Sequence, residues 1–217
     1  AIAQGLIWGI MAIGVYITYK VLDIADLTVD GSICTGGAVC IMLMRANFPL
    51  PAAMLIAVLA GMATGLVTGL FHTLMGIPAI LAGILTQLSL YSINLKIMGK
   101  ANQAINARNY DVLVSMQNLR DVPLYDNTIL IVAIFVIVLI ALLYWFFGTE
   151  LGCSLRATGC NPNMSRAQGI NTGFNKVLGL IISNGIVALS GALLAQYQGF
   201  ADVQMGRGAI VIGLAAV

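Results

Sequence analysis

The stretch GCSLRATGCNPNMSRAQGIN, residues 152–171, is a polar passage between two strongly apolar runs. Asn161 can accept hydrogen bonds from backbone amides two and three residues later, and so cap a helix. Pro162 follows at the first helical position, where its missing N–H group costs nothing. Gly169 favours the left-handed conformation that ends many helices. The pattern predicts a short helix over residues 163–168 whose two ends are fixed by its own sequence.

The residues before this helix predict a loop in which Gly152 and Gly159 are flexible points. The alternative is a plain solvated connection without any helix, because short capped helices and irregular loops both connect longer elements. The residues alone leave these two interpretations open.

Composition decides the class of the protein. The chain has 217 residues, of which 60% are hydrophobic and 8% are charged. Soluble domains carry about 25% charged residues, and several apolar runs here approach the roughly 20 residues that cross a bilayer as a helix. The alternating polarity of membrane barrel strands is not evident. We therefore expect an all-α, polytopic integral membrane helical bundle that forms one domain over residues 1–217.

The charged and thiol residues indicate no further class of ligand. A formal net charge of +2 gives no reason to expect a nucleic-acid partner. The four cysteines lack the C-x-x-C or C-x-x-H spacing that is typical of zinc sites. We expect neither a metal site nor a cofactor bound by this chain.

The apolar runs predict about seven membrane spans. They cover residues 2–22, 31–45, 52–71, 77–98, 128–147 and 174–196, and a seventh begins at residue 209. Because the last span is incomplete, we expect a truncated part of a longer membrane domain. Asp30 is expected to cap the helix at 31–45. Gly61, Gly65 and Gly69 repeat every four residues and predict a face that packs against another helix of the same chain.

One predicted span carries a polar stripe. Gln87, Tyr91 and Asn94 are spaced i, i+4 and i+7, which places them on one face of a helix. Polar groups at membrane depth must face partners or water. The stripe therefore either lines a path for a solute or forms hydrogen bonds between helices, and the spacing does not separate these alternatives.

The two ends of the chain resemble each other. Gly-Leu-Ile begins an apolar run at residues 5–7 and again at 179–181, and an Ala-Asp pair follows each run, ending in Asp26 and in Asp202. The second copy begins five spans after the first, an odd number, so the pattern predicts an inverted repeat, in which solute sites form where broken helices meet. Asp26, Asp202 and Asn184 thus join the stripe as candidate path residues, although the acids can equally be loop residues or helix caps.

The passage at 152–171 resembles the cytoplasmic coupling loop of ABC-transporter permeases, in the group that serves branched-chain amino acids, ribose and related solutes. The resemblance implies a coupling loop over residues 148–173 whose helix docks on a separate ATPase subunit. The residues that carry it, or that lie on the implied docking helix, are Gly152, Arg156, Ala157, Gly159, Asn161, Pro162, Arg166, Ala167, Gly169 and Ile170.

Two further passages, LDIADLTVDGS at 22–32 and GIPAILAGILTQLSLYSINLKIMGK at 76–100, resemble the permeases associated with tryptophan and tyrosine uptake. The likeness implies a multi-pass subunit of an importer in a bacterial plasma membrane, for amino acids, including aromatic ones, or a similar small solute. It also implies an extracytoplasmic solute-binding protein, a second permease subunit that forms a homodimer, and a surrounding lipid bilayer.

The chain has no Walker sequence, GxxxxGK[ST], and no evident nucleophile–base constellation. We therefore expect a transport subunit rather than an enzyme, with ATP bound and hydrolysed by a partner. A secondary transporter with inverted repeats is the alternative, since it would share the repeat but need no helix that docks on an ATPase. Dependence of uptake on an active ATPase would distinguish the two.

Overall fold

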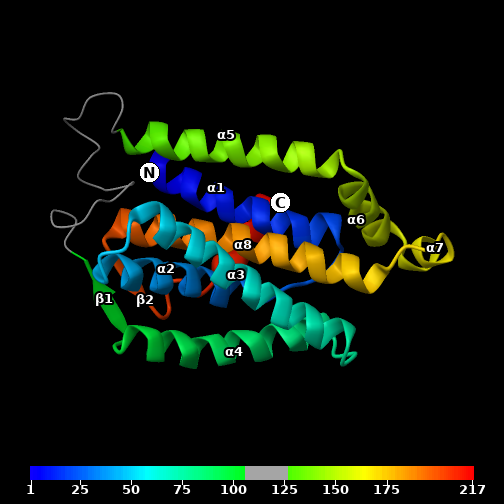
Figure 1. The fold of residues 1–217 in the computed structure, drawn as a ribbon, viewed down its shortest axis with the longest axis horizontal. Helices are drawn as coiled ribbons and strands as arrows, with labels where there is room; N and C mark the ends of the chain where they lie inside the picture. The colour runs from blue at the N-terminus through cyan, green and yellow to red at the C-terminus, as the bar shows by residue number, and fades with distance from the viewer. Residues whose placement is uncertain (106–126) are drawn as a thin grey trace.

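The computed structural model describes residues 1–105 and 127–217, which form a helical bundle with a small two-stranded sheet at one end (Figure 1). In chain order the elements are α1 (Ile2–Tyr16), the π-helix η1 (Ile17–Val21), α2 (Val29–Arg45), α3 (Leu50–Thr73), α4 (Ala79–Met98), β1 (Asn102–Ala104), α5 (Thr128–Phe147), α6 (Glu150–Cys160), α7 (Pro162–Ala167), α8 (Thr172–Gln198), β2 (Phe200–Asp202) and α9 (Ala209–Ala216).

Helix α8 is the centre of the bundle, and it contacts α1, α2, α3 and α6. Its mid-section is buried on nearly all sides, whereas α5, the most apolar helix, buries only Thr128 and Val132. A helix that is apolar on all sides is stable only when a protein core or a membrane covers it, and this protein leaves much of α5 uncovered. Within the described residues, five helices are long and apolar enough to cross a membrane, namely α1 continued by η1, α3, α4, α5 and α8.

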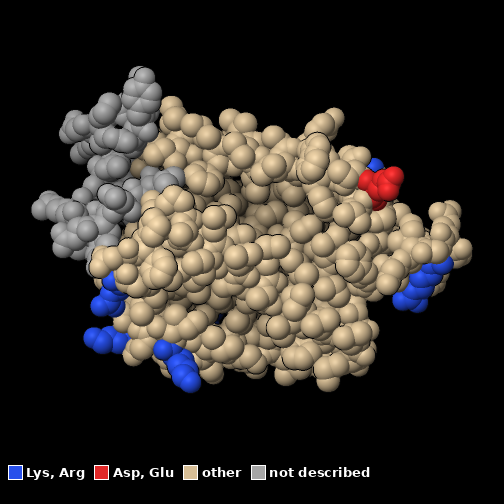
Figure 2. Space-filling model, viewed as in Figure 1, with Lys and Arg blue, Asp and Glu red and all other residues tan. Residues whose placement is uncertain are grey.

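The distribution of charged side chains fits helices that cross a membrane. On the face shown in Figure 2, the described Lys, Arg, Asp and Glu residues lie at the two ends of the bundle, with an uncharged band between them. Helix α5, with 20 residues, is about 30 Å long, which matches the hydrocarbon thickness of a bilayer. The expected polytopic all-α membrane bundle is therefore confirmed. The count of seven spans stays a prediction, because α2, with 17 residues, and α9, with 8, are shorter than the other five.

The small sheet was not expected from the sequence. Strands β1 and β2 pair antiparallel, with Asn102 opposite Asp202 and Ala104 opposite Phe200. Three residues per strand are too few to produce a detectable alternation of polarity. The remainder of the expected polar connection at 99–127 lies largely outside the described residues.

The glycine ridge on α3 packs against α8, as predicted. A Cβ atom on Gly61 would come within 2.7 Å of the Asn184 backbone oxygen, and one on Gly65 would overlap the Leu180 backbone oxygen. Small residues at these positions let two helices approach closely in lipid, where dispersion contacts rather than the hydrophobic effect hold helices together.

The beginnings of α2 and α9 contact each other. Asp30 was expected to cap its own helix, but this prediction is wrong, because α2 begins at Val29 and Asp30 lies in its first turn. Its carboxylate instead accepts hydrogen bonds from the backbone amides of Gly208, at 3.3 Å, and Ile210, at 3.0 Å. The first amides of α9 have no partner within their helix, and a carboxylate from α2 satisfies two donors there.

The two Ala-Asp pairs have similar local structures. Asp26 accepts a hydrogen bond from the amide of Thr28 at 2.9 Å, and Asp202 accepts one from the amide of Gln204 at 3.0 Å. The preceding helices, α1 and α8, contact each other and run in opposite directions (Figure 1). These features agree with an inverted repeat, which itself stays a prediction.

Replacing Gly65 by alanine tests the packing of α3 on α8. We expect Gly65→Ala to lower the free energy of unfolding by about 1–3 kcal/mol, because the added methyl group must push the two backbones apart. The same substitution at Gly5, where an added Cβ meets nothing within 4 Å, should leave stability unchanged or slightly raised. Denaturation of the purified protein in mixed micelles measures both, and equal effects would contradict this account of the ridge.

Candidate functional site

The predicted short helix is α7, and it lies beyond the end of the long helices (Figure 1). The Asn161 side-chain oxygen accepts from the amides of Asn163 and Met164, both at 3.1 Å. Pro162 occupies the first turn, and Gly169 has φ of +84°, the left-handed conformation that was expected. The cap, the proline and the terminating glycine are thus confirmed, and together they fix the conformation of α7.

Gly152 and Gly159 are not flexible points, so this part of the prediction is wrong. Both lie within α6, an 11-residue helix that the sequence analysis had taken as a loop. A Cβ on Gly159 would overlap the backbone oxygen of Val21 in η1, and one on Gly152 would overlap the backbone at Phe146 and Phe147. These glycines are therefore required for close backbone contact rather than for a special backbone conformation.

Side-chain hydrogen bonds attach the α6–α7 segment to α8. Asn175 of α8 donates to the hydroxyl of Thr158 in α6 at 2.9 Å, and the Nε group of Arg166 donates to the hydroxyl of Thr172 at 2.8 Å. The outer surface of the segment is exposed, and Arg156, Ala157 and Ala167 lie on it. Hydrogen bonds to α8 hold the inner side of the segment in place, and its exposed outer side is accessible to a partner.

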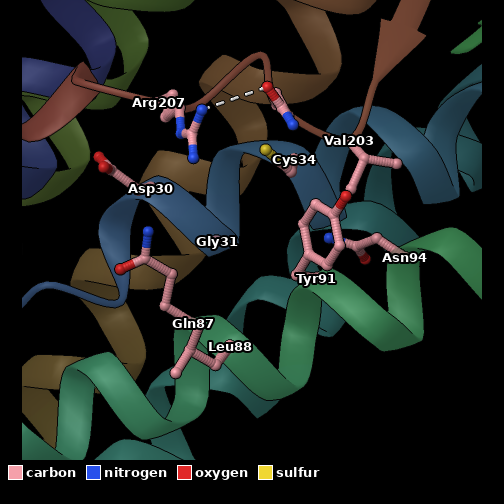
Figure 3. A pocket seen from close by; sticks show the side chains of 10 residues that line it. Asp30, Gly31, Cys34, Gln87, Leu88, Tyr91, Asn94, Val203 and Arg207 are labelled. Carbon is pink, nitrogen blue, oxygen red and sulfur yellow. Dashed lines mark hydrogen bonds between the residues drawn. The ribbon is translucent and has the colours of Figure 1, made fainter. Parts of the chain in front are cut away.

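A second candidate region is a cavity of about 130 Å³ between α2, α4 and the segment 203–208 (Figure 3). The predicted stripe of Gln87, Tyr91 and Asn94 lines one wall. Asp30, which was expected only as a helix cap, and Arg207, which the sequence did not single out, line the opposite side. The α4 cavity is therefore lined by two opposite charges and, with Gln204, four uncharged polar side chains.

The amide of Asn94 has no partner among the described residues. Its side chain is buried, with 1% exposure, and neither its nitrogen nor its oxygen atom makes a hydrogen bond within the part of the chain that the structure describes. Buried polar groups are almost always paired, so this residue is an exception in the cavity wall.

The other three candidate path residues do not line the α4 cavity. Asp26 is buried and accepts from the amide of Asn184 at 2.8 Å, and the Asn184 oxygen accepts from the Ser32 hydroxyl at 2.6 Å. Asp202 lies on β2. The hydrogen bonds of Asp26, Asn184 and Ser32 extend to α3 through two pairs of hydroxyl groups. Ser32 of α2 pairs with Thr64, and Thr28, the N-cap of α2, pairs with Thr68. Asp26 and Asn184 thus hold α8 to the break before α2.

The polar network gives a stability prediction. Asn184→Leu should lower the free energy of unfolding by about 1–3 kcal/mol, because it removes the carboxamide that donates to the buried Asp26 carboxylate. The double variant Asp26→Leu, Asn184→Leu should cost less than the sum of the two single changes. Additive costs in a chemical denaturation series would show that the two side chains do not interact.

The stripe gives an accessibility prediction. Cysteines at Gln87 and Tyr91, in a background without the four native cysteines, should react with a water-soluble thiol reagent in the membrane. A cysteine at Ile93, on another face of α4, should react at least tenfold more slowly, since thiolates form poorly in lipid. Leu88 is an unsuitable control, because it also lines the cavity. Equal rates at Gln87 and Ile93 would argue against a hydrated cavity.

The chain is similar to known transport proteins over its whole length. The family model described as "Branched-chain amino acid transport system / permease component" matches residues 1–217. A tyrosine transport system permease protein of Clostridioides difficile (strain R20291) is 43% identical over 99% of this chain and 69% of its own length.

Two further relatives extend the comparison. An uncharacterized protein of Rickettsia prowazekii (strain Madrid E) is 36% identical over 100% of this chain and 74% of its own length. The autoinducer 2 import system permease protein LsrC of Photorhabdus luminescens is 28% identical over 87% of this chain and 56% of its own length. No solved structure gives a significant match. The match over all 217 residues, on a bundle of apolar helices, identifies the chain as a member of the branched-chain amino acid transport system permease family.

Proposed function

We propose that the chain is the membrane-spanning subunit of an ATP-driven ABC importer for an amino acid, with aromatic amino acids as the first candidates. Its membership of a permease family and its likeness to a tyrosine transport permease support this substrate class. The observation that carries the ATP-driven part is α7, a short helix fixed at both ends and presented outside the bundle.

A subunit that is driven by an ATPase needs a rigid element to receive the movement. A flexible loop would absorb the displacement. Helix α7 would transmit it, because its cap and its terminating glycine fix both of its ends. Beneath it, α6 contacts the backbone of η1 at Gly159 and binds α8 through Thr158. A movement of α7 would therefore reach both the first span and the central helix.

The surface of α7 suits a docking contact. Met164 is 60% exposed and offers an apolar contact at the end of the molecule. Arg166 was expected to face the partner, and its Nε group is occupied by Thr172, which leaves the terminal guanidinium nitrogens for carboxylates or carbonyls. Arg156 is exposed on the neighbouring helix α6.

The proposal also includes the partner subunits and the solute path. The ATPase binds and hydrolyses ATP on the cytoplasmic side of a bacterial plasma membrane, and an extracytoplasmic binding protein delivers the solute. A second copy of the permease completes the pathway as a homodimer. Residues Gln87, Tyr91 and Asn94, with Asp30 and Arg207, form part of the path.

Gly169→Val tests the coupling role. A β-branched residue is strongly disfavoured at positive φ, so the end of α7 should unwind. We expect the variant to insert normally but to lose co-purification with the ATPase and at least 90% of ATP-driven uptake in proteoliposomes. Asn161→Ala should weaken the cap by only about 1 kcal/mol and reduce uptake less.

Gly76→Val is the matched control. Gly76 has φ of +69° and no atom within 4 Å of an added Cβ, and it lies between α3 and α4, at the same end of the bundle as α7 (Figure 1). This variant also places a β-branched residue at positive φ, and it should still co-purify with the ATPase. If Gly169→Val also keeps its ATPase and transports normally, α7 is an ordinary connection. Uptake that persists with an inactivated ATPase and follows an ion gradient would instead support a secondary transporter.

A further inference from the structure

The amide of Asn94, in the wall of the α4 cavity, makes no hydrogen bond with the described residues, and packing does not explain why a polar group lies there. The residue is 1% exposed and lines the cavity, so it is the cavity-wall group whose hydrogen-bonding capacity the described residues leave unused. An amide offers a nitrogen that donates and an oxygen that accepts. A carboxylate can only accept and an ammonium group can only donate, whereas a hydroxyl or a carboxamide can do both. The group that suits Asn94 is therefore neutral and polar.

The charged groups lie at the other end of the cavity. Figure 3 shows Asp30, Arg207 and Gln87 together, away from Tyr91 and Asn94. The Asp30 carboxylate accepts from two backbone amides, and about two of its four lone-pair sites stay available. Arg207 donates weakly to the Gln204 side chain, at 3.5 Å, and keeps its other N–H groups. One end can thus bind an ammonium group and a carboxylate side by side.

The distance between the two ends limits the solute. Gln87 and Asn94 are seven residues apart on α4, which corresponds to about 10 Å along the helix axis. Leu88, Val203 and the ring of Tyr91 line the cavity as well, and they favour an apolar body between the two polar ends.

We propose that the α4 cavity binds a zwitterionic solute in one orientation. Asn94 then selects among solutes by forming hydrogen bonds with the group at the end of the solute's side chain. The preferred tip is a neutral group that both donates and accepts a hydrogen bond, at the end of a long apolar or aromatic side chain. This inference rests on the proposed function for its solute class. It adds that the permease itself discriminates, independently of the binding protein.

L-tyrosine and L-phenylalanine test this inference, because they differ only in a hydroxyl at the tip. Binding is measured on the purified permease in lipid nanodiscs, without its partners, as displacement of radiolabelled L-tyrosine. We expect L-tyrosine to bind about tenfold more tightly than L-phenylalanine, because the latter leaves the Asn94 amide unpaired. O-methyl-L-tyrosine, which accepts but cannot donate, should fall between them, and tyramine, which lacks the carboxylate, should bind at least tenfold more weakly than tyrosine.

Asn94→Leu should reduce the preference for tyrosine over phenylalanine to twofold or less. Because Asn94 makes no hydrogen bond within residues 1–105 and 127–217, this variant should melt at the same temperature as the wild type, or higher, without solute. Ser89→Ala, on the same helix but exposed and bonded to its own helix carbonyl at Leu85, should keep the full preference.

The inference is overturned if the wild type binds tyrosine and phenylalanine within twofold, if no amino acid displaces the label up to millimolar concentrations, or if Asn94→Leu keeps the preference. The wild-type solute series decides the matter even if the variant fails to fold. These outcomes are separate from those of the proposed function, because ATP-dependent uptake and its loss in Gly169→Val do not require discrimination by Asn94.

Discussion

Inside a bilayer every backbone amide and carbonyl needs a partner within the protein, and this requirement shapes the centre of the molecule. Two helices, α2 and α9, begin next to each other, and their first amides have no partners within their own helices. Asp30 supplies acceptors for α9 from the first turn of α2, while Asp26 accepts from the amide of Thr28, the residue just before α2. Broken helices are possible here because acidic side chains complete their hydrogen bonding.

The same requirement explains how the polar residues divide between two tasks. Asp26, Asn184 and Ser32 satisfy one another and join α8 to α2, so they contribute to the fold. Gln87, Tyr91 and Asn94 face a cavity instead, and Asn94 is left without a partner. A group that packing does not satisfy is available to a ligand, and this difference separates the candidate solute site from the structural network.

Glycine also serves two purposes in this protein. Gly61, Gly65, Gly152 and Gly159 allow backbones to approach more closely than any Cβ would permit. Gly169, by contrast, meets no neighbour and is needed for its positive φ. The first kind connects α6 and α8 to their neighbours, and the second ends α7. A rigid connection from α7 to the core of the bundle depends on both.

The amino-acid sequence was enough to predict a membrane protein, the positions of the long helices, the packing ridge on α3, and the capped helix after Asn161, because each depends on local composition, periodicity or capping. The stripe on α4 was visible for the same reason. Only the tertiary structure decided that Gly159 packs on η1, that Asp30 serves α9 rather than its own helix, and that Asp26 and Asn184 lie apart from the α4 cavity. These outcomes depend on contacts between residues up to 180 positions apart, and periodicity along one helix carries no information about which distant helix lies opposite.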